Sequence, residues 1–420
     1  MRFVKRLPYG SKGVTIQSVS EKRNENSESK EKDYMEHVTE KIINIGVNDR
    51  SVTLFEGQYA VKHGMAYNSY VILDEKTAVM DTVDGRVTDD WLAGLELALN
   101  GKSVDYLVVQ HMEPDHSGSV QELADRFPQM KIVASASAFQ MMKQFFEIDL
   151  EGRMLVVKEG DTLELGAHTL QFYTAPMVHW PEVIVTYEKT ERIVFSADGF
   201  GKFGTRDTAE DWTCEARRYY INICGKYGPQ VQALLKKLAT LDVAVICPLH
   251  GPVLTENLAY YIGKYDIWSR YEPEDKGILI AFASVYGHTR EAVMKLKEIL
   301  ETKSRVKVKV CDLCREDPHE AIENAFRYDR LVLAAISYDA GVFPAMDDFL
   351  RHLKGKNFQN RTVALIENGS WGPTAGKAMK ALLEEMKEIT ILDPMITIRS
   401  AIKPETVTQL EELADTLLKH

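Results

Sequence analysis

The chain has 420 residues, of which 45% are hydrophobic and 27% are charged, and its formal net charge at pH 7 is −11. This length predicts two or three domains with buried cores, and the composition excludes a disordered, collagen-like or coiled-coil chain. The acidic balance argues against nucleic acid as a main partner, and no run of about 18 apolar residues suggests a membrane span. Five cysteines are too few for a disulfide framework. We therefore expect a cytoplasmic protein that binds neither nucleic acid nor membrane.

Residues 1–36 form the first distinct segment, and they are polar and mostly charged towards their end. Such a segment cannot bury enough apolar area to offset the entropy lost on ordering. The basic N-terminus is not followed by the apolar run of a secretory signal. We predict a flexible extension over residues 1–36, with the structured part beginning near Met35.

Residues 37–268 are predicted to form a first domain made mainly of short strands. β-branched residues and turn chemistry place strands at 69–73, 77–80, 106–110, 131–134, 169–174, 183–187, 192–196 and 243–247. Helices are expected at 87–99, 117–127, 135–146 and 228–241. Strands in succession with helices outside predict two packed sheets covered by helices.

Residues 265–277 are interpreted as a connector, and residues 269–420 as a second domain. The pattern there changes to strict alternation of strand and helix. Strands are expected at 278–283, 306–310, 331–335, 362–367 and 390–392, and helices at 289–302, 317–326, 344–354, 373–387 and 404–419. This alternation predicts a doubly wound parallel sheet.

Four potential metal ligands follow the strand at 106–110 within six residues: His111, Glu113, Asp115 and His116. In an extended turn, residues two apart point the same way, so this run can serve two metals about 3.5–4 Å apart. Further candidate ligands follow later strands, namely His179, Asp198 and His250. Any one of them alone would be an ordinary turn residue, but the cluster predicts a metal centre.

Three loops of the second domain predict a flavin site. The loop after its first strand offers hydroxyls, a glycine and a helix N-terminus, which suit a monophosphate. It lacks the lysine of a nucleoside-triphosphate loop. In the 2-1-3-4-5 order FMN lies at the carboxyl ends of the strands, where Tyr338 and Trp371 can flank its ring. The expected FMN-binding residues are Ser284, Val285, Tyr286, Gly287, His288, Thr289, Ser337, Tyr338, Asp339, Ala340, Gly341, Asn368, Gly369, Ser370, Trp371 and Gly372.

The ligand-rich turn resembles that of the metallo-β-lactamase fold, whose usual form is His-x-His-x-Asp-His. Glu113 stands in place of the second histidine. Imidazole-rich sites suit zinc hydrolases, whereas added carboxylates favour iron. The exchange therefore moves the expectation from a hydrolase to a redox enzyme.

The two constellations on one chain resemble the flavodiiron proteins (A-type flavoproteins) over about residues 45–420. The specific marks are Gly57-Gln58-Tyr59, Tyr67-Asn68-Ser69-Tyr70, residues 78–83, residues 111–116, Met177 to Pro181, Asp198-Gly199-Phe200, Pro248 to Gly251, the loop 284–289 and Gly369 to Gly372. The resemblance implies a metallo-β-lactamase-like αββα sandwich followed by a flavodoxin-like domain.

By this resemblance, one iron is bound by His111, Glu113 and His179, the other by Asp115, His116 and His250, and Asp198 bridges them. The family implies reduction of dioxygen to water at this non-haem diiron site, with electrons passed from rubredoxin or a similar carrier through FMN. It also implies a head-to-tail homodimer, with a tetramer as the larger alternative, in which the flavin of one protomer lies beside the diiron site of the other.

Three alternatives stay open at this point. The same site can reduce nitric oxide to N2O, and the sequence leaves the choice of gas open. A zinc hydrolase fused to a flavodoxin-like module would need a hydrolytic metal, and a simple electron shuttle would hold FMN alone. Residues 335–338 read Ala-Ile-Ser-Tyr where the family has Ser-Pro-Thr-Tyr, and whether Lys62 or His63 lines the substrate pocket is also left open.

Overall fold

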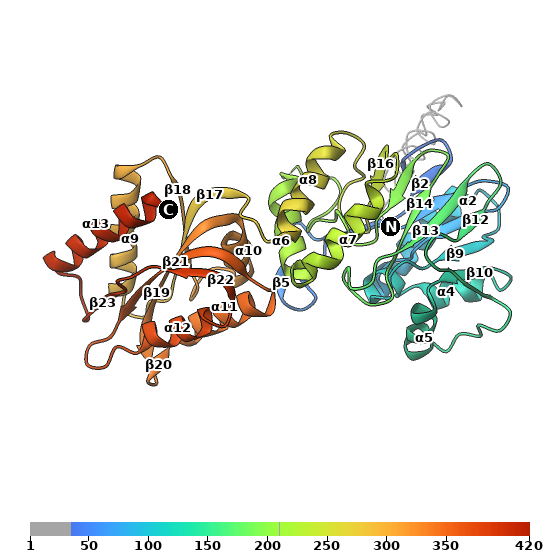
Figure 1. The fold of residues 1–420 in the computed structure, drawn as a ribbon. Helices are drawn as coiled ribbons and strands as arrows, with labels where there is room; N and C mark the ends of the chain where they lie inside the picture. Colours follow the sequence, from blue (N-terminus) through green and yellow to red (C-terminus); the bar gives the residue numbers. More distant parts are fainter. Residues whose placement is uncertain (1–34, 210) are drawn as a thin grey trace, which may run out of the picture.

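The protein, seen here as a computed structural model, has two lobes that follow one another along the chain (Figure 1). The structure describes residues 35–209 and 211–420, so nearly all of the extension expected at 1–36 lies outside the described residues. Within the described residues, no helix is long and apolar enough to cross a membrane.

Two mixed β-sheets form the N-terminal lobe. One has seven strands in the order β1-β2-β7-β8-β9-β10-β11, and the other has five in the order β12-β13-β14-β15-β16. The seven-stranded sheet comprises β1 (Glu36–His37), β2 (Ile42–Asn44), β7 (Tyr70–Ile72), β8 (Ala78–Met80), β9 (Tyr106–Val108), β10 (Lys131–Ala134) and β11 (Met154–Val156). The five-stranded sheet comprises β12 (Thr162–Glu164), β13 (Thr169–Thr174), β14 (Ile184–Glu188), β15 (Ile193–Phe195) and β16 (Val245–Cys247). Two short ribbons pair β3 (Val47–Asp49) with β6 (Met65–Tyr67) and β4 (Leu54–Phe55) with β5 (Tyr59–Ala60).

The two sheets pack face to face through apolar side chains. Met80 and Val108 of one sheet share a buried cluster with Phe172 and Phe195 of the other. Helices cover both outer faces, which makes the predicted αββα sandwich correct. They are α2 (Thr88–Leu99), α3 (Pro114–Ser117), α4 (Val120–Arg126), α5 (Ala136–Phe145), α6 (Trp212–Ile223), α7 (Gly228–Leu238) and α8 (Leu258–Ser269), with short 3-10 turns η1 (Gly85–Val87) and η2 (Gly225–Tyr227).

The C-terminal lobe is a doubly wound parallel sheet, as predicted, with the strand order β18-β17-β19-β21-β22, which is 2-1-3-4-5. Its strands are β17 (Asp275–Phe282), β18 (Lys307–Asp312), β19 (Tyr328–Tyr338), β21 (Gln359–Asn368) and β22 (Lys387–Ile391), with β20 (Gly341–Val342) and β23 (Ile396–Ile398) at its side. Helices α9 (His288–Lys303) and α13 (Pro404–Lys419) cover one face, and α10 (Pro318–Arg327), α11 (Pro344–Gly355) and α12 (Ala375–Leu383) cover the other.

Several short strands were not expected, and four helices differ from the sequence-based expectation. Helix α6 was not expected. Helix α8 ends at Ser269, so residues 265–269, which were expected to begin the connector, are helical. Tyr265 and Trp268 explain this extension because both are buried in the core beside α6. The helix expected at 117–127 is interrupted at Gly118, where a Cβ would lie 2.5 Å from the Pro114 carbonyl oxygen. The helix expected at 373–387 ends earlier, and residue 387 begins β22.

A buried ion cluster joins the two lobes. Arg217 of α6 donates to Glu274 of the connecting segment, with Nε 2.6 Å from Oε2, and also to Glu323 of α10. All three side chains are at most 5% exposed. Lys264 and Trp268 donate to the same Glu274 carboxylate. Because the three charges are buried and paired, the cluster holds α6 against α10.

Candidate metal centre and flavin pocket

The turn that follows β9 is held by a carboxylate at the end of the neighbouring strand β8. Asp81 accepts hydrogen bonds from the backbone N–H groups of Gln110 (2.7 Å) and His111 (3.3 Å) and from the Gln110 side chain (2.9 Å). Complete burial raises the pKa of Asp81 to about 6, although these hydrogen bonds oppose the rise. The contacts fix the point at which the chain leaves the sheet, and therefore the position of His111.

Four side chains from three separate strand ends meet in a first group. Glu113 Oε2 lies 3.2 Å from His111 Nε2 and 3.0 Å from His179 Nε2. Asp198 Oδ2 lies 3.3 and 3.1 Å from the same two nitrogens. One potential ligand atom from each of the four side chains lies within 4.8 Å of all the others. Two imidazoles and two carboxylates thus converge on one point.

A second group adjoins the first. Asp115 Oδ2 lies 3.3 Å from His116 Nε2 and 3.2 Å from His250 Nε2. Asp198 Oδ1 faces the same two nitrogens at 3.1 and 3.7 Å. The two oxygens of Asp198 are therefore divided between the groups, which is the geometry of a carboxylate that bridges two metal ions.

Burial and opposite charge set the protonation of these side chains. Burial by itself would raise the pKa of Asp198, but the charge of His111 and the close imidazoles of His116 and His179 hold that pKa well below its usual value. For Glu113 the same balance lowers the pKa to about 2. Burial disfavours a charged His179, yet Asp198 and Glu113 raise its pKa to about 9. Glu113 and Asp198 are therefore ionised, and metal binding would displace a proton from His179.

Several buried polar atoms of the two groups have no hydrogen-bond partner. They are both carboxylate oxygens of Asp115 and of Asp198, both ring nitrogens of His116, and Nε2 of His250. Buried polar groups are almost always paired in folded proteins. Metal ions would satisfy these atoms, and a set of four imidazoles and three carboxylates suits iron. The residues present therefore fit a two-metal centre.

One buried residue at this centre was missed by sequence reasoning. Glu182 is fully buried, and its Oε1 lies 2.8 Å from His111 Nδ1. It follows His179 by three residues in the run His-Trp-Pro-Glu, which is the only signal the sequence offers.

Lys62 and His63 lie away from the metal centre. They line a polar pocket of about 100 Å³ together with Arg218, and none of the candidate metal ligands lines this pocket.

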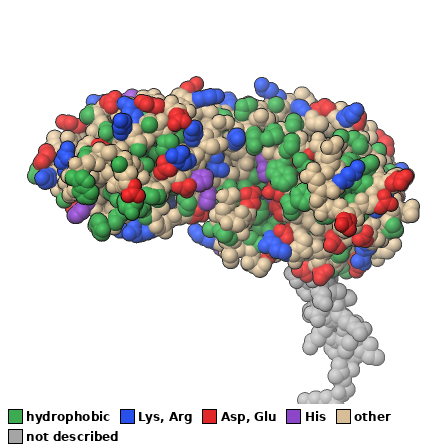
Figure 2. Space-filling view, turned by 90° about the horizontal axis from the view of Figure 1, so that it is seen from below, with side chains coloured by type: hydrophobic (Ala, Val, Ile, Leu, Met, Phe, Trp, Pro, Cys, Tyr) green, Lys and Arg blue, Asp and Glu red, His purple; other side chains and the backbone are tan. Residues whose placement is uncertain are grey.

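The space-filling view shows where the surface narrows between the lobes (Figure 2). Histidine and acidic side chains are visible around this waist. Elsewhere on this face, Lys and Arg are interspersed with Asp and Glu. Charges of both signs are therefore mixed across this face.

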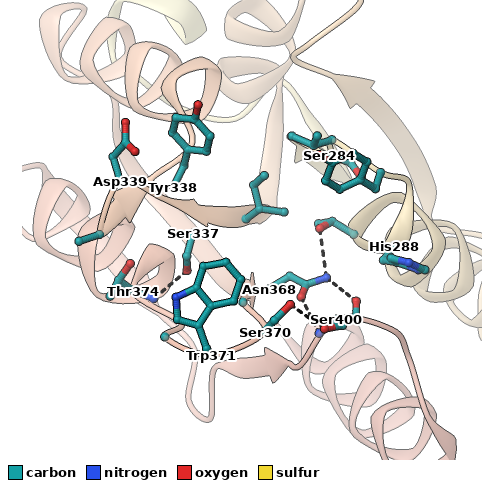
Figure 3. Close-up of a pocket in the computed structure, with 17 residues that line it drawn as sticks. Ser284, His288, Ser337, Tyr338, Asp339, Asn368, Ser370, Trp371, Thr374 and Ser400 are labelled. Atoms are coloured by element: carbon teal, nitrogen blue, oxygen red, sulfur yellow. Dashed lines mark hydrogen bonds between the residues drawn. The ribbon is translucent and has the colours of Figure 1, made fainter.

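The C-terminal lobe holds a pocket of about 570 Å³ at the carboxyl ends of its strands. Figure 3 shows Ser284 and His288 on one side of it and Tyr338 and Asp339 on another, with Trp371 between them. All residues expected to bind FMN line the pocket except Gly287 and Gly341. The sequence did not single out three further lining residues, Ile336, Thr374 and Ser400.

The phosphate end of the pocket is the start of α9. Gly287, with φ +94°, is the N-cap residue, and it has no side chain to cap the helix. Of the first backbone N–H groups of this 16-residue helix, that of Arg290 donates to Ser284 Oγ at 3.4 Å, whereas those of His288 and Thr289 are open to an anion, and the Ser284 and Thr289 hydroxyls are buried beside them. This chemistry fits a phosphate monoester such as that of FMN.

The ring end of the pocket is formed by two aromatic side chains on loops. Tyr338 is 49% exposed and Trp371 is 94% exposed. The loop departing from the family pattern is well anchored, because Ser337 Oγ accepts from the backbone N–H groups of Thr374 (2.7 Å) and Ala375 (3.0 Å). Ser337 of the Ala-Ile-Ser-Tyr sequence thus connects this loop to the start of α12.

Comparisons with known proteins agree with this architecture. A family model described as ODP family beta lactamase matches residues 65–251. The chain is 33% identical over 273 residues to diflavin flavoprotein A 2 of Synechocystis sp., which covers 63% of this chain and 47%, about half, of that relative. It is 28% identical over 361 residues to the anaerobic nitric oxide reductase flavorubredoxin of Vibrio vulnificus, covering 83% of this chain and 73% of the relative.

Solved structures show the same two-lobed fold. Rubredoxin oxygen:oxidoreductase from the anaerobe Desulfovibrio gigas matches with a TM-score of 0.85 and 24% identity, over 92% of this chain and 98% of that chain. The flavodiiron protein of Giardia intestinalis matches with a TM-score of 0.85 and 21% identity, over 92% and 97% of the two chains.

Proposed function

We propose that this chain, a member of the flavodiiron protein family, is an oxidoreductase that reduces dioxygen to water at a diiron centre supplied with electrons through FMN. One observation carries the proposal. The two oxygens of Asp198 are divided between two buried groups of histidine and carboxylate, on the same chain as a pocket that suits FMN.

The ligands divide between the irons as the two groups do. His111, Glu113 and His179 hold one iron, Asp115, His116 and His250 hold the other, and Asp198 bridges them. Two irons and one flavin together supply the four electrons that reduce one dioxygen to two waters. The protein's own part is to exclude water, because both groups are nearly buried, and to keep Glu113 and Asp198 ionised through the charge of the neighbouring histidines.

In the flavin pocket, the open N-terminus of α9 and the Ser284 hydroxyl bind the phosphate of FMN. Tyr338 and Trp371 flank the ring. We assign residues 37–268 to the diiron domain and residues 269–420 to the FMN domain. The protein acts in the cytoplasm.

Electrons come from rubredoxin or a similar small carrier. The Desulfovibrio protein of the same fold is named as an oxidoreductase between rubredoxin and oxygen, which supports a donor of this class. The two sites lie in different lobes of one chain (Figure 1), and the rim of the flavin pocket exposes Tyr286 by 91% and Trp371 by 94%. A head-to-tail homodimer would cover this rim and bring the FMN of one protomer to the diiron site of its partner.

Nitric oxide reduction is the second candidate at the same site, because the Vibrio relative is named as an anaerobic nitric oxide reductase. A hydrolytic zinc site is less suitable, since Glu113 adds a hard anionic ligand at the place of an imidazole.

Gas consumption by the reduced, iron-loaded protein tests the proposal. Oxygen and nitric oxide electrodes would record the two rates separately, with reduced rubredoxin as donor. We expect faster loss of dioxygen without release of peroxide. Faster loss of nitric oxide would assign the second candidate, and loss of neither gas would contradict both.

A further inference from the structure

Glu182 contacts the metal centre from behind one of its histidines. Its Oε1 accepts hydrogen bonds from His111 Nδ1 (2.8 Å) and from the backbone N–H of Met112 (2.9 Å). Its own carbonyl accepts from Ser135 Oγ at 2.8 Å, so the residue is held in place from a third side. The Glu182 side chain is 0% exposed, which leaves no water to weaken the contact.

This contact fixes the tautomer of His111. A carboxylate oxygen can only accept, so Nδ1 carries a proton towards Glu182. Nε2, which faces Glu113 and Asp198, is then the nitrogen that would give up its proton to a metal ion. Glu182 also lies three residues after His179 along the chain. One short segment therefore positions two ligands of the same group.

The second group has no comparable carboxylate among the described residues. His250 Nδ1 donates to the Ala66 carbonyl at 2.7 Å, which is a neutral acceptor. His116 Nδ1 is buried without a hydrogen-bond partner. The two groups thus share Asp198 and each have one further carboxylate ligand. Among the described residues, only in the first group does a buried carboxylate accept a hydrogen bond from the outer nitrogen of an imidazole ligand.

We infer that Glu182 is a positioning residue that makes the two irons unequal. The iron held by His111, Glu113 and His179 is bound more tightly, and is harder to reduce, than the iron held by Asp115, His116 and His250. An anionic partner makes an imidazole a stronger ligand and adds negative charge that stabilises a more highly charged metal. The inference rests on the proposed function, because it requires iron in both groups.

The test replaces Glu182 by glutamine in the full-length protein. Glutamine Oε1 can still accept from His111, so Glu182→Gln removes the charge with little change in shape. Outer partners of this kind change metal affinity by about 10–100-fold. We therefore expect a chelator competing for Fe(II) to remove one iron from the variant at a 10–100-fold lower concentration, while the second iron leaves as in the wild type.

Anomalous X-ray scattering from partly depleted crystals identifies the iron that is lost, and the inference requires it to be the one beside His111. A redox titration followed by Mössbauer spectroscopy should show that one of the two iron potentials rises. Glu188→Gln is the matched control. Glu188 is buried at the far end of β14, and it accepts from the backbone N–H groups of Thr190 (2.9 Å) and Glu191 (2.6 Å), away from the ligands.

Equal weakening of both irons, loss of the iron beside His116, or an effect no larger than that of Glu188→Gln would overturn the inference. If Glu182→Gln does not fold, Glu182→Asp takes its place. Aspartate withdraws the carboxylate by one methylene, and selective weakening of the same iron is again required. A wild-type protein that binds no pair of irons would instead overturn the proposed function, so the two failures are distinguishable.

Discussion

The metal centre and the flavin pocket are built in opposite ways. The metal ligands are almost fully buried and held by further hydrogen bonds, such as those of Asp81 and Glu182 to the His111 turn. The flavin pocket is open, and its aromatic residue Trp371 is 94% exposed. Unpaired charges in the interior are costly, so the metal ligands need hydrogen-bond partners that hold them in place before the ions bind. A planar cofactor can instead bind between exposed loop side chains and cover them when it binds.

The largest effect is expected where the two iron positions meet. Replacing Asp198 by asparagine removes the bridging charge from both groups, so we expect loss of both irons and of all gas turnover while FMN stays bound. Iron content, FMN content and oxygen consumption measured on one preparation check this. A variant that keeps both irons and full activity would show that Asp198 does not bridge.

Glu113→His introduces the histidine of the more usual lactamase-like turn. It therefore tests the chemistry of this one ligand while the fold stays the same. Glu113 contacts the nitrogens of His111 and His179, so the exchange makes the first group less anionic. We expect turnover of dioxygen to be abolished, FMN to remain, and zinc to compete better with iron. Retained oxygen reduction with unchanged metal preference would contradict this view of Glu113.

The next largest effect is expected on stability, at the ion cluster between the lobes. Replacing Arg217 by methionine leaves Glu323 buried without its Arg217 partner, which should lower the free energy of unfolding by about 3–5 kcal/mol. Arg192→Met, at an exposed ion pair with Asp242, should cost clearly less, because water and salt screen exposed charges. Denaturant unfolding of both variants measures the difference, and similar values would contradict a structural role for the cluster.

The same cluster predicts a pH dependence. Burial opposes ionisation of Glu274, but Arg217 and Lys264 lower its pKa from 4.5 to about 2. Because the folded-state pKa is the lower one, this stabilisation is fully present above about pH 4.5 and is lost as the pH falls towards 2. The loss of stability with acid over this range should therefore be shallower in Arg217→Met than in the wild type. Equal slopes would exclude the cluster as its source.

The smallest effect is expected at the flavin ring. Trp371→Ala removes one aromatic wall but leaves the phosphate site of α9 intact, so FMN should bind about tenfold more weakly. Phe145→Ala is the control, since Phe145 is 46% exposed and does not line the pocket. Fluorescence titration of flavin-free protein measures both, and unchanged affinity in Trp371→Ala would remove this residue from the site.

The sequence predicted the parts of the molecule that depend on local pattern. The doubly wound sheet of the C-terminal lobe followed from alternation, and the seven candidate ligands that the structure brings together were recognisable because each follows a strand. Glu182, Thr374 and Ser400 were missed because their roles depend on distant partners, such as the 71-residue separation between His111 and Glu182. Helix α8 was partly read as a connector because Tyr265 and Trp268 are buried by packing on Tyr220 of α6, which is distant in the sequence.

The most direct test of the account is the cofactor content of the full-length protein purified without oxygen. Elemental analysis and the absorbance of released flavin would give the amounts per chain. The account predicts two irons and one FMN per chain, with both irons lost and the FMN kept in Asp198→Asn. A single metal ion, zinc in place of iron, or irons that survive the loss of the Asp198 charge would contradict it.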